Sequence, residues 1–124
     1  MKALKIILSI FVIGLIFGGC AYNWIVEEEA VDPTDPDAPE VSFSTQIVPI
    51  FSSKCVTCHS TGGQSPDLTT ENAYSSLNSS RYVNTSDPAS SLIYTKPMGN
   101  HAQVYSTAEA ALVLTWITQG AQNN

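Results

Sequence analysis

The five residues Cys55-Val56-Thr57-Cys58-His59 decide how the rest of this 124-residue chain is interpreted. The C-x-x-C-H spacing is typical of covalent haem attachment, in which two cysteines form thioether bonds to the porphyrin and the adjacent imidazole binds the iron. The thioethers anchor one edge of the macrocycle, which leaves the next side chain under the iron. The motif therefore predicts a site for one covalent haem c.

Two other kinds of site use the same side chains. A structural zinc site needs four ligands, and this chain offers only Cys55, Cys58, His59 and His101, without a second C-x-x-C or an H-x-x-x-H. A thioredoxin-like dithiol follows a strand and starts a helix at its first cysteine, but no strand pattern precedes Cys55. We favour haem and keep the zinc site and the dithiol as alternatives.

The composition argues against nucleic acid as a partner. The chain has a net charge of −6, a pI of about 4.5 and only five basic residues, whereas phosphate binding requires clustered Lys and Arg. Seven of the eleven acidic residues fall within residues 20–42, so residues 43–124 carry a net charge of only −1. The acidic pI therefore describes the N-terminal part of the chain and not the expected domain.

Residues 1–19 have the pattern of a secretory signal peptide. Lys2 and Lys5 precede an apolar run that is shorter than the about 20 residues of a membrane span. The following Gly18-Gly19-Cys20 resembles the lipobox of bacterial lipoproteins, although Phe17 stands where Leu is usual. The resemblance implies a lipid on Cys20 and a periplasmic or outer-membrane lipoprotein of the bacterial cell envelope. The alternatives are an uncleaved membrane anchor and a signal cut elsewhere.

Residues 20–42 are expected to form a disordered, lipid-anchored tether. This segment is acidic and rich in proline, a composition that cannot bury a core and that stiffens the chain. Lipid on Cys20 and haem on Cys55 and Cys58 would account for all three cysteines of the chain. No free thiol would then remain, which suits an oxidising compartment.

Helical patterns begin at residue 43. Ser44 or Thr45 is expected to cap a first helix over the apolar residues 47–51, with Pro49 in its first turn, where its missing N–H has no partner. This short helix would lead directly into the cysteine motif.

Two further helices are expected in the middle of the chain. Thr69 or Thr70 is expected to cap a helix from Glu71 to Leu77. Asp87-Pro88 combines a cap with proline at the first helical position, and predicts a helix over Ala89 to Tyr94.

The last helix has the clearest pattern. Ser106-Thr107-Ala108-Glu109 predicts a capping box, and an apolar stripe over residues 112–117 then ends at Gly120. Because no alternating strand pattern of useful length occurs, the fold class predicted for residues 43–124 is all-α. So short a domain buries only a modest core, so a haem at its centre would add much of the apolar surface.

The region from about Val41 to the end of the chain resembles class I cytochrome c domains. The resemblance rests on the C-x-x-C-H motif, on Ile47-Val48-Pro49-Ile50-Phe51 before it, on Ser91-Leu92-Ile93-Tyr94, and on Trp116-Ile117-Thr118-Gln119-Gly120-Ala121. It implies a small bundle of about four short helices around one covalent haem, over residues 43–124.

The resemblance also implies the iron ligands. His59 would be the proximal ligand and Met98 the distal ligand, since Pro97-Met98-Gly99 is expected to form a tight loop close to the macrocycle rather than a piece of core. We expect their ligand atoms to face each other across a crevice, roughly 4–5 Å apart. His101 is the alternative distal ligand and would give a lower potential.

Residues around the haem follow from the same resemblance. Pro66 would accept the ring N–H of His59 through its carbonyl oxygen, and Arg81, Tyr82 and Tyr94 could reach the propionates. The implied function is an exported, lipid-anchored monohaem cytochrome that carries single electrons between redox partners at the cell envelope, and not an enzyme. The alternatives are an exported thiol-disulfide oxidoreductase that uses the two motif cysteines, and a haem sensor or peroxidase-like protein with a labile distal ligand.

Overall fold

The computed structural model describes residues 31–124, and within this range the chain is helical with no β-strand. The predicted all-α class is therefore confirmed for the described part of the chain. The expected signal peptide over residues 1–19, the lipid site at Cys20 and the tether up to residue 30 lie outside the described residues. Within residues 31–124, each helix is too short or too polar to cross a membrane.

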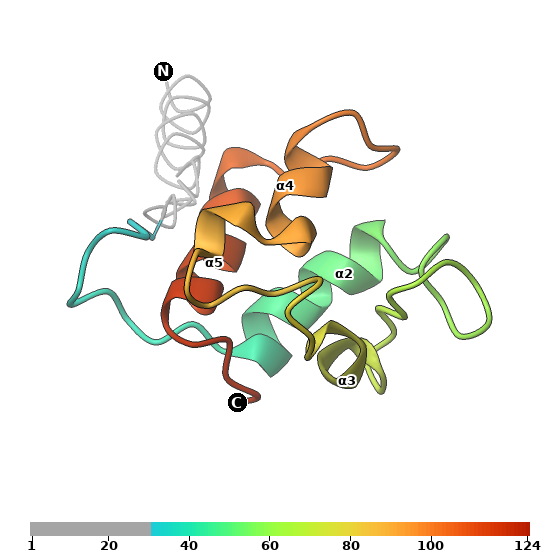
Figure 1. Cartoon of the computed structure of the whole chain (residues 1–124), viewed down its shortest axis with the longest axis horizontal. Coiled ribbons are helices and arrows are strands. Elements are labelled where there is room, and N and C mark those ends of the chain that lie inside the picture. The colour runs from blue at the N-terminus through green and yellow to red at the C-terminus, as the bar shows by residue number, and fades with distance from the viewer. Residues whose placement is uncertain (1–30) are drawn as a thin grey trace, which may run out of the picture.

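Four α-helices and two short helical turns, joined by loops, are found in the described part of the chain (Figure 1). The longest of them, α5, contacts η1, η2 and α4, while α2 continues directly from η1. In chain order the elements are the π-helical turn η1 (Phe43–Ile47), α2 (Val48–Lys54), α3 (Ala73–Leu77), the 3₁₀ turn η2 (Pro88–Ser90), α4 (Leu92–Met98) and α5 (Thr107–Thr118).

The N-cap of the first helical segment lies two residues before the first of the two predicted caps. Ser42, and not Ser44 or Thr45, is the N-cap, because Ser42 is extended and its side chain accepts a hydrogen bond from the N–H of Thr45 at 3.3 Å. Pro49 is the second residue of α2, a position where a backbone N–H has no partner within that helix. The predicted placement of this proline is confirmed.

The helix predicted from Glu71 is shorter than expected. It begins at Ala73, and neither Thr69 nor Thr70 is its cap. The reason lies in Asp67, whose carboxylate accepts hydrogen bonds from the Thr69 hydroxyl at 2.6 Å and from the Thr69 N–H at 3.0 Å. The Thr69 side chain is thus turned back toward Asp67, and the N-cap residue of the helix is Asn72, which makes no side-chain cap bond.

The helix predicted over Ala89 to Tyr94 is divided in two. Ser91 has an extended ψ of 131°, which ends η2 and starts α4. Its hydroxyl accepts a hydrogen bond from the N–H of Asn84 at 2.9 Å, which holds the break in place. The second part continues through Pro97 to Met98, so the tight loop expected around Met98 is instead the last turn of a helix.

Helix α5 matches its predicted N-terminus. The Ser106 hydroxyl accepts from the N–H of Glu109 at 3.2 Å, and the Glu109 carboxylate accepts from the N–H of Ser106 at 2.6 Å. This reciprocal pair is the predicted capping box. Gly120, with φ of 98°, follows the helix in the left-handed region that glycine tolerates best.

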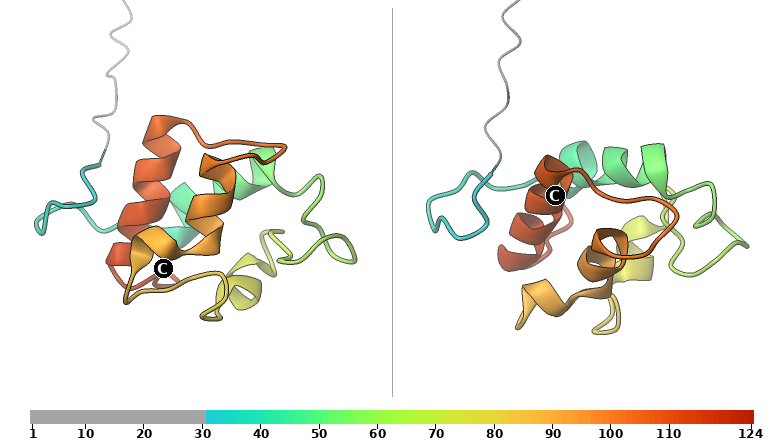
Figure 2. Two further views of the ribbon diagram at one scale, coloured as in Figure 1. Left: turned by 45° about the horizontal axis from the view of Figure 1, so that its top comes forward. Right: turned by 90° about the horizontal axis from the view of Figure 1, so that it is seen from above.

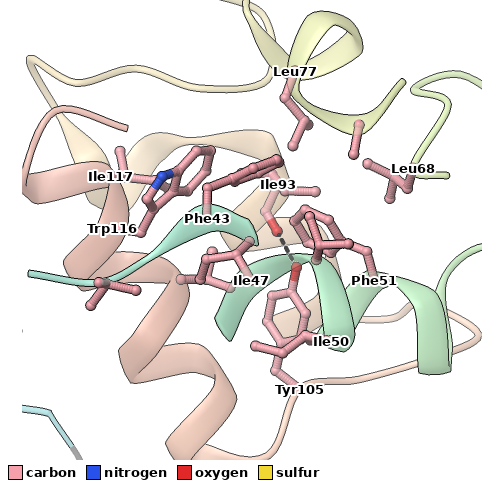
Figure 3. Close-up of a cluster of buried hydrophobic side chains, with 14 of the residues drawn as sticks. Phe43, Ile47, Ile50, Phe51, Leu68, Leu77, Ile93, Tyr105, Trp116 and Ile117 are labelled. Atoms are coloured by element: carbon pink, nitrogen blue, oxygen red, sulfur yellow. Dashed lines mark hydrogen bonds between the residues drawn. The ribbon is translucent and has the colours of Figure 1, made fainter. Parts of the chain in front are cut away.

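The core is centred on the ring of Phe43 (Figure 3). Its centroid lies 5.1 Å from that of Trp116, 5.3 Å from that of Tyr74 and 6.4 Å from that of Phe51. The indole N–H of Trp116 donates to the carbonyl oxygen of Gln122 at 2.9 Å, so this buried polar group is paired. The helix before the cysteine motif is thereby fixed against α5.

The two ends of the packed region are held together. The side chain of Gln119 accepts from the N–H of Val41 at 2.8 Å, and Asn124 accepts from the N–H of Phe43 at 2.7 Å through its side chain. Val41 is only 2% exposed. The packed region therefore begins at Val41, two residues before the expected boundary at residue 43.

The loop that follows α2 and the loop between α4 and α5 lie at the same end of the molecule (Figure 2). Residues 31–40 lie at the opposite end in all three views (Figures 1 and 2). The first of these loops carries the cysteine motif and the second carries His101. The fold thus places both segments with candidate ligands away from the end where the described chain begins.

Candidate functional site

The cysteine motif begins at the end of α2. Cys55 is the C-cap of this helix, and the N–H groups of Cys58 and His59 both donate to its carbonyl oxygen, at 3.1 and 2.9 Å. Cys55 is half-buried against the core and Cys58 is exposed, and neither forms a disulfide. These bonds wind the motif into a tight turn after the helix.

The loop after the motif closes back on His59. The N–H of Leu68 donates to the carbonyl oxygen of His59 at 2.7 Å, and the N–H of Gln64 donates to that of Cys58 at 2.9 Å. The Nδ1 atom of His59 lies 3.0 Å from the carbonyl oxygen of Pro66. Because the acceptor is a carbonyl, this contact places the proton on Nδ1 and leaves Nε2 as the free ligand atom. The structure therefore brings together the predicted pair His59 and Pro66.

His59 and Cys55 line a cavity of about 320 Å³. Its volume falls within the range of about 300–1,000 Å³ that is typical of ligand sites. A larger cavity of about 520 Å³ lies elsewhere, between α3 and the end of α5, and contains none of the motif residues. The apolar and aromatic part of the wall around His59 comes from four segments of the chain, as Leu68, Tyr82, Leu92, Ile93, Pro97 and Tyr105.

The two candidate distal ligands differ in position. His101 lines the cavity, and its ring centroid lies 6.0 Å from that of His59, with the ring planes 24° apart. Met98 is 52% exposed and does not line the cavity. The structure therefore places His101, the alternative ligand, beside His59, although His101 is itself exposed, and it does not bring Met98 into the expected crevice.

The helical geometry of α4 explains the position of Met98. Ile93 and Pro97 are four residues apart and share the face that lines the cavity. Tyr94 and Met98 are also four residues apart, about 100° further around the helix, and neither lines the cavity. Because Tyr94 and Met98 lie on this neighbouring face of α4, neither the predicted iron ligand nor this predicted propionate contact lines the cavity.

The positive charges of the described residues are concentrated at this cavity. Residues 31–124 contain three basic side chains, and Lys54 forms an ion pair with Glu109 at 2.6 Å. The other two, Arg81 and Lys96, both line the cavity. Arg81 lies over the Tyr82 ring, at 5.5 Å from its centroid. Two cations beside an apolar cavity fit a ligand that has an apolar body and anionic groups.

Sequence reasoning missed two residues of the cavity wall. Lys96 could have been proposed as a residue of the site because residues 43–124 contain so few basic residues. Tyr105 lies in a stretch without helical periodicity. It is buried, and its hydroxyl is paired by donating to the carbonyl oxygen of Ile93 at 3.0 Å (Figure 3). No pattern in the sequence indicates that long-range bond.

The Cys55 thiol is poorly placed for thiol-disulfide chemistry. Burial raises the pKa of the Cys55 thiol, Lys54 opposes that effect, and the Glu109 carboxylate adds to it. Cys55 also stands at the C-terminal end of α2, where the helix dipole disfavours a thiolate, whereas reactive cysteines have a lowered pKa. Within residues 31–124, no three His, Cys, Asp or Glu side chains are grouped to hold a metal ion, as a zinc site would need.

Comparison of the chain with family models, with curated proteins and with solved structures finds no match in any of the three. The function must therefore be inferred from the residues of the site and their geometry.

Proposed function

We propose that this chain is an exported, lipid-anchored monohaem c-type cytochrome that carries single electrons between redox partners at a bacterial cell envelope. The observation that carries the proposal is the position of His59. It follows the two motif cysteines directly, it lines the cavity, and its Nδ1 is held by the carbonyl oxygen of Pro66 at 3.0 Å. An imidazole with its second nitrogen fixed by a backbone carbonyl is the usual arrangement of a metal-binding histidine.

The other residues of the cavity fit a haem. Cys55 borders the cavity and Cys58 is exposed, so thioethers at these positions would leave one edge of the macrocycle near solvent. The apolar wall suits the porphyrin, and Arg81 and Lys96 offer one cation for each propionate. A bound haem would supply a one-electron couple between ferric and ferrous iron.

Each residue would contribute in a different way. His59 would bind the iron through Nε2, and Pro66 would keep the imidazole oriented and its Nδ1 protonated. Leu68, Ile93 and Tyr105 are buried and would exclude water from the haem face, which tunes the potential through the local dielectric. Such a protein needs no substrate pocket, and an exposed haem edge is sufficient for electron exchange with a docked partner.

The envelope location and the lipid anchor are proposed from the sequence. Residues 1–19 have the signal pattern, and Cys20 is positioned for lipid attachment. The acidic, proline-rich tether would let the domain move between partners while it remains attached to the membrane. The near-neutral charge of residues 43–124 suits weak and transient docking.

Haem staining of a denaturing gel tests the proposal. The full chain would be produced in a bacterial host that has a c-type maturation system. We expect a haem-stained band for the wild type and for the Cys20→Ala control, since the control removes a cysteine outside the motif. The Cys55→Ala, Cys58→Ala double variant should show none. A wild-type band without haem and with two alkylatable thiols at Cys55 and Cys58 would contradict the proposal and favour the oxidoreductase alternative.

A further inference from the structure

We propose that His101, and not Met98, is the sixth ligand of the haem iron, so that the site is a bis-histidine centre. This inference rests on the proposed function, because it assumes that haem is attached at Cys55 and Cys58. It concerns residues that the two loops at one end of the molecule bring together (Figure 2).

The separation of the two rings fits a shared metal ion. A first-row metal ion binds an imidazole nitrogen at about 2.0–2.1 Å, as zinc does, so two nitrogens on opposite sides of it lie about 4 Å apart. Adding the half-width of each ring gives a centroid separation of roughly 6 Å. The observed separation between His59 and His101 is 6.0 Å, with the rings stacked and their planes 24° apart, so iron binding between them requires the imidazoles to rotate until both Nε2 atoms face the metal.

The hydrogen bonds of the two rings are alike. Nδ1 of His59 lies 3.0 Å from the carbonyl oxygen of Pro66, and Nδ1 of His101 lies 3.1 Å from that of Gln103. The N–H of Gln103 also approaches the His101 Nδ1, but at the longer distance of 3.4 Å. The two contacts of His101 need opposite tautomers. When Nδ1 donates to the Gln103 carbonyl, as at His59, Nε2 is the lone-pair nitrogen available to iron, whereas Nδ1 accepting from the Gln103 N–H would leave the proton on Nε2.

The chain around His101 supports this position. The N–H of His101 donates to the carbonyl oxygen of Gly99 at 3.0 Å, which forms a tight turn directly after α4. Further along, the N–H of Tyr105 donates to the carbonyl oxygen of Pro97 at 3.4 Å, which returns the loop to the cavity wall. Met98 lies before this turn, on the neighbouring face of α4, and is 52% exposed.

Optical and magnetic circular dichroism spectra of the purified haem protein, with carbon monoxide binding as a second readout, test the assignment. The wild type should be low-spin, should lack a charge-transfer band from methionine sulfur to ferric iron, and should not bind carbon monoxide. Met98→Ala should leave all three properties unchanged. His101→Ala should keep its covalent haem, lose the low-spin spectrum and bind carbon monoxide. His101→Met should gain the sulfur band and a higher potential, which keeps the test decisive if His101→Ala does not fold.

The opposite pattern would overturn the inference. A sulfur band in the wild type, or a loss of the low-spin spectrum in Met98→Ala, would assign the sixth position to Met98. A His101→Ala spectrum identical to that of the wild type would also exclude His101. In each of these cases haem would still be bound. Absence of covalent haem in the wild type would instead refute the proposed function, so the two failures are distinguishable.

Discussion

The Nδ1 atom of His59 lies 3.0 Å from the carbonyl oxygen of Pro66, seven residues later in the chain. This contact orients the imidazole beside the cavity, and it depends on the loop between the two residues. The bonds that shape this loop are local, from Gly63 to Ser60 at 2.8 Å and from Gln64 to Cys58 at 2.9 Å. Substitutions that disturb the loop should therefore affect both stability and the candidate haem site.

Gly63→Ala should destabilise the domain by about 1–3 kcal/mol, the usual cost of forcing extra atoms into a packed site. A Cβ atom at this position would lie 2.7 Å from the carbonyl oxygen of Cys58, which is backbone and cannot rotate away. Urea unfolding of the haem-loaded protein measures the change. Gly99→Ala is the matched control, because its Cβ would meet only ordinary contacts of 3.7 and 3.8 Å. Equal stability of the two variants would contradict this account of the loop.

The domain should lose stability in acid, in part through Asp67. Hydrogen bonds from the Thr69 side chain, the Thr61 side chain and the Thr69 N–H lower the pKa of its carboxyl group, although burial opposes them. Since the folded pKa is below the unfolded value of about 4, the contribution is present above pH 4 and is lost as the pH falls through the folded pKa. Asp67→Asn should reduce the slope of stability against pH below 4. An unchanged slope in urea titrations at several pH values would refute the role of Asp67.

Thr115→Val should stabilise the protein by about 1–3 kcal/mol, the cost of leaving a buried polar group unpaired. The Thr115 side chain is 2% exposed, and its hydroxyl has no hydrogen-bond partner among the described residues. Thr118→Val is the matched control on the same helix, because the Thr118 hydroxyl is exposed and donates to the carbonyl oxygen of Leu114 at 2.9 Å. The control should change the free energy of unfolding by less than about 0.5 kcal/mol. Destabilisation by Thr115→Val would show that the hydroxyl has a partner.

Arg81→Gln and Lys96→Gln should each lower the reduction potential of the haem-loaded protein. Both side chains line the cavity, and loss of a positive charge near the iron disfavours the added electron. Arg81→Lys and Lys96→Arg keep the charge and should change the potential less. Potentiometric titration followed by absorbance measures the shift. A potential that is insensitive to both glutamine substitutions would mean that neither cation is near the haem.

The sequence predicted the features that depend on neighbouring residues. The capping box joins Ser106 to Glu109 within one turn, and the cysteine motif is contained in five residues. The contact between His59 and Pro66 spans only seven residues. In each case the chemistry of the local segment is sufficient, because no distant part of the chain competes for the same groups.

Some features depend on which partner a side chain binds, or on which face of a helix a residue occupies. These features were not predictable from the sequence. Thr69 could cap a helix, but its side chain turns back and donates to the Asp67 carboxylate. Met98 lies outside the cavity because α4 continues through Pro97 and places Met98 on the neighbouring face of the helix. Tyr105 is buried with its hydroxyl bonded to Ile93, twelve residues away, and no local pattern encodes that contact.

The central claim is that Cys55 and Cys58 carry one covalent haem. The most direct test is the intact mass of the exported protein, purified and denatured after treatment with a thiol-alkylating reagent. Each S–H adds across a vinyl group without loss of atoms, so the mass should exceed that of the polypeptide and its lipid by one whole haem, with no alkylation at either cysteine. A mass without haem, increased by alkylation at both Cys55 and Cys58, would contradict the account.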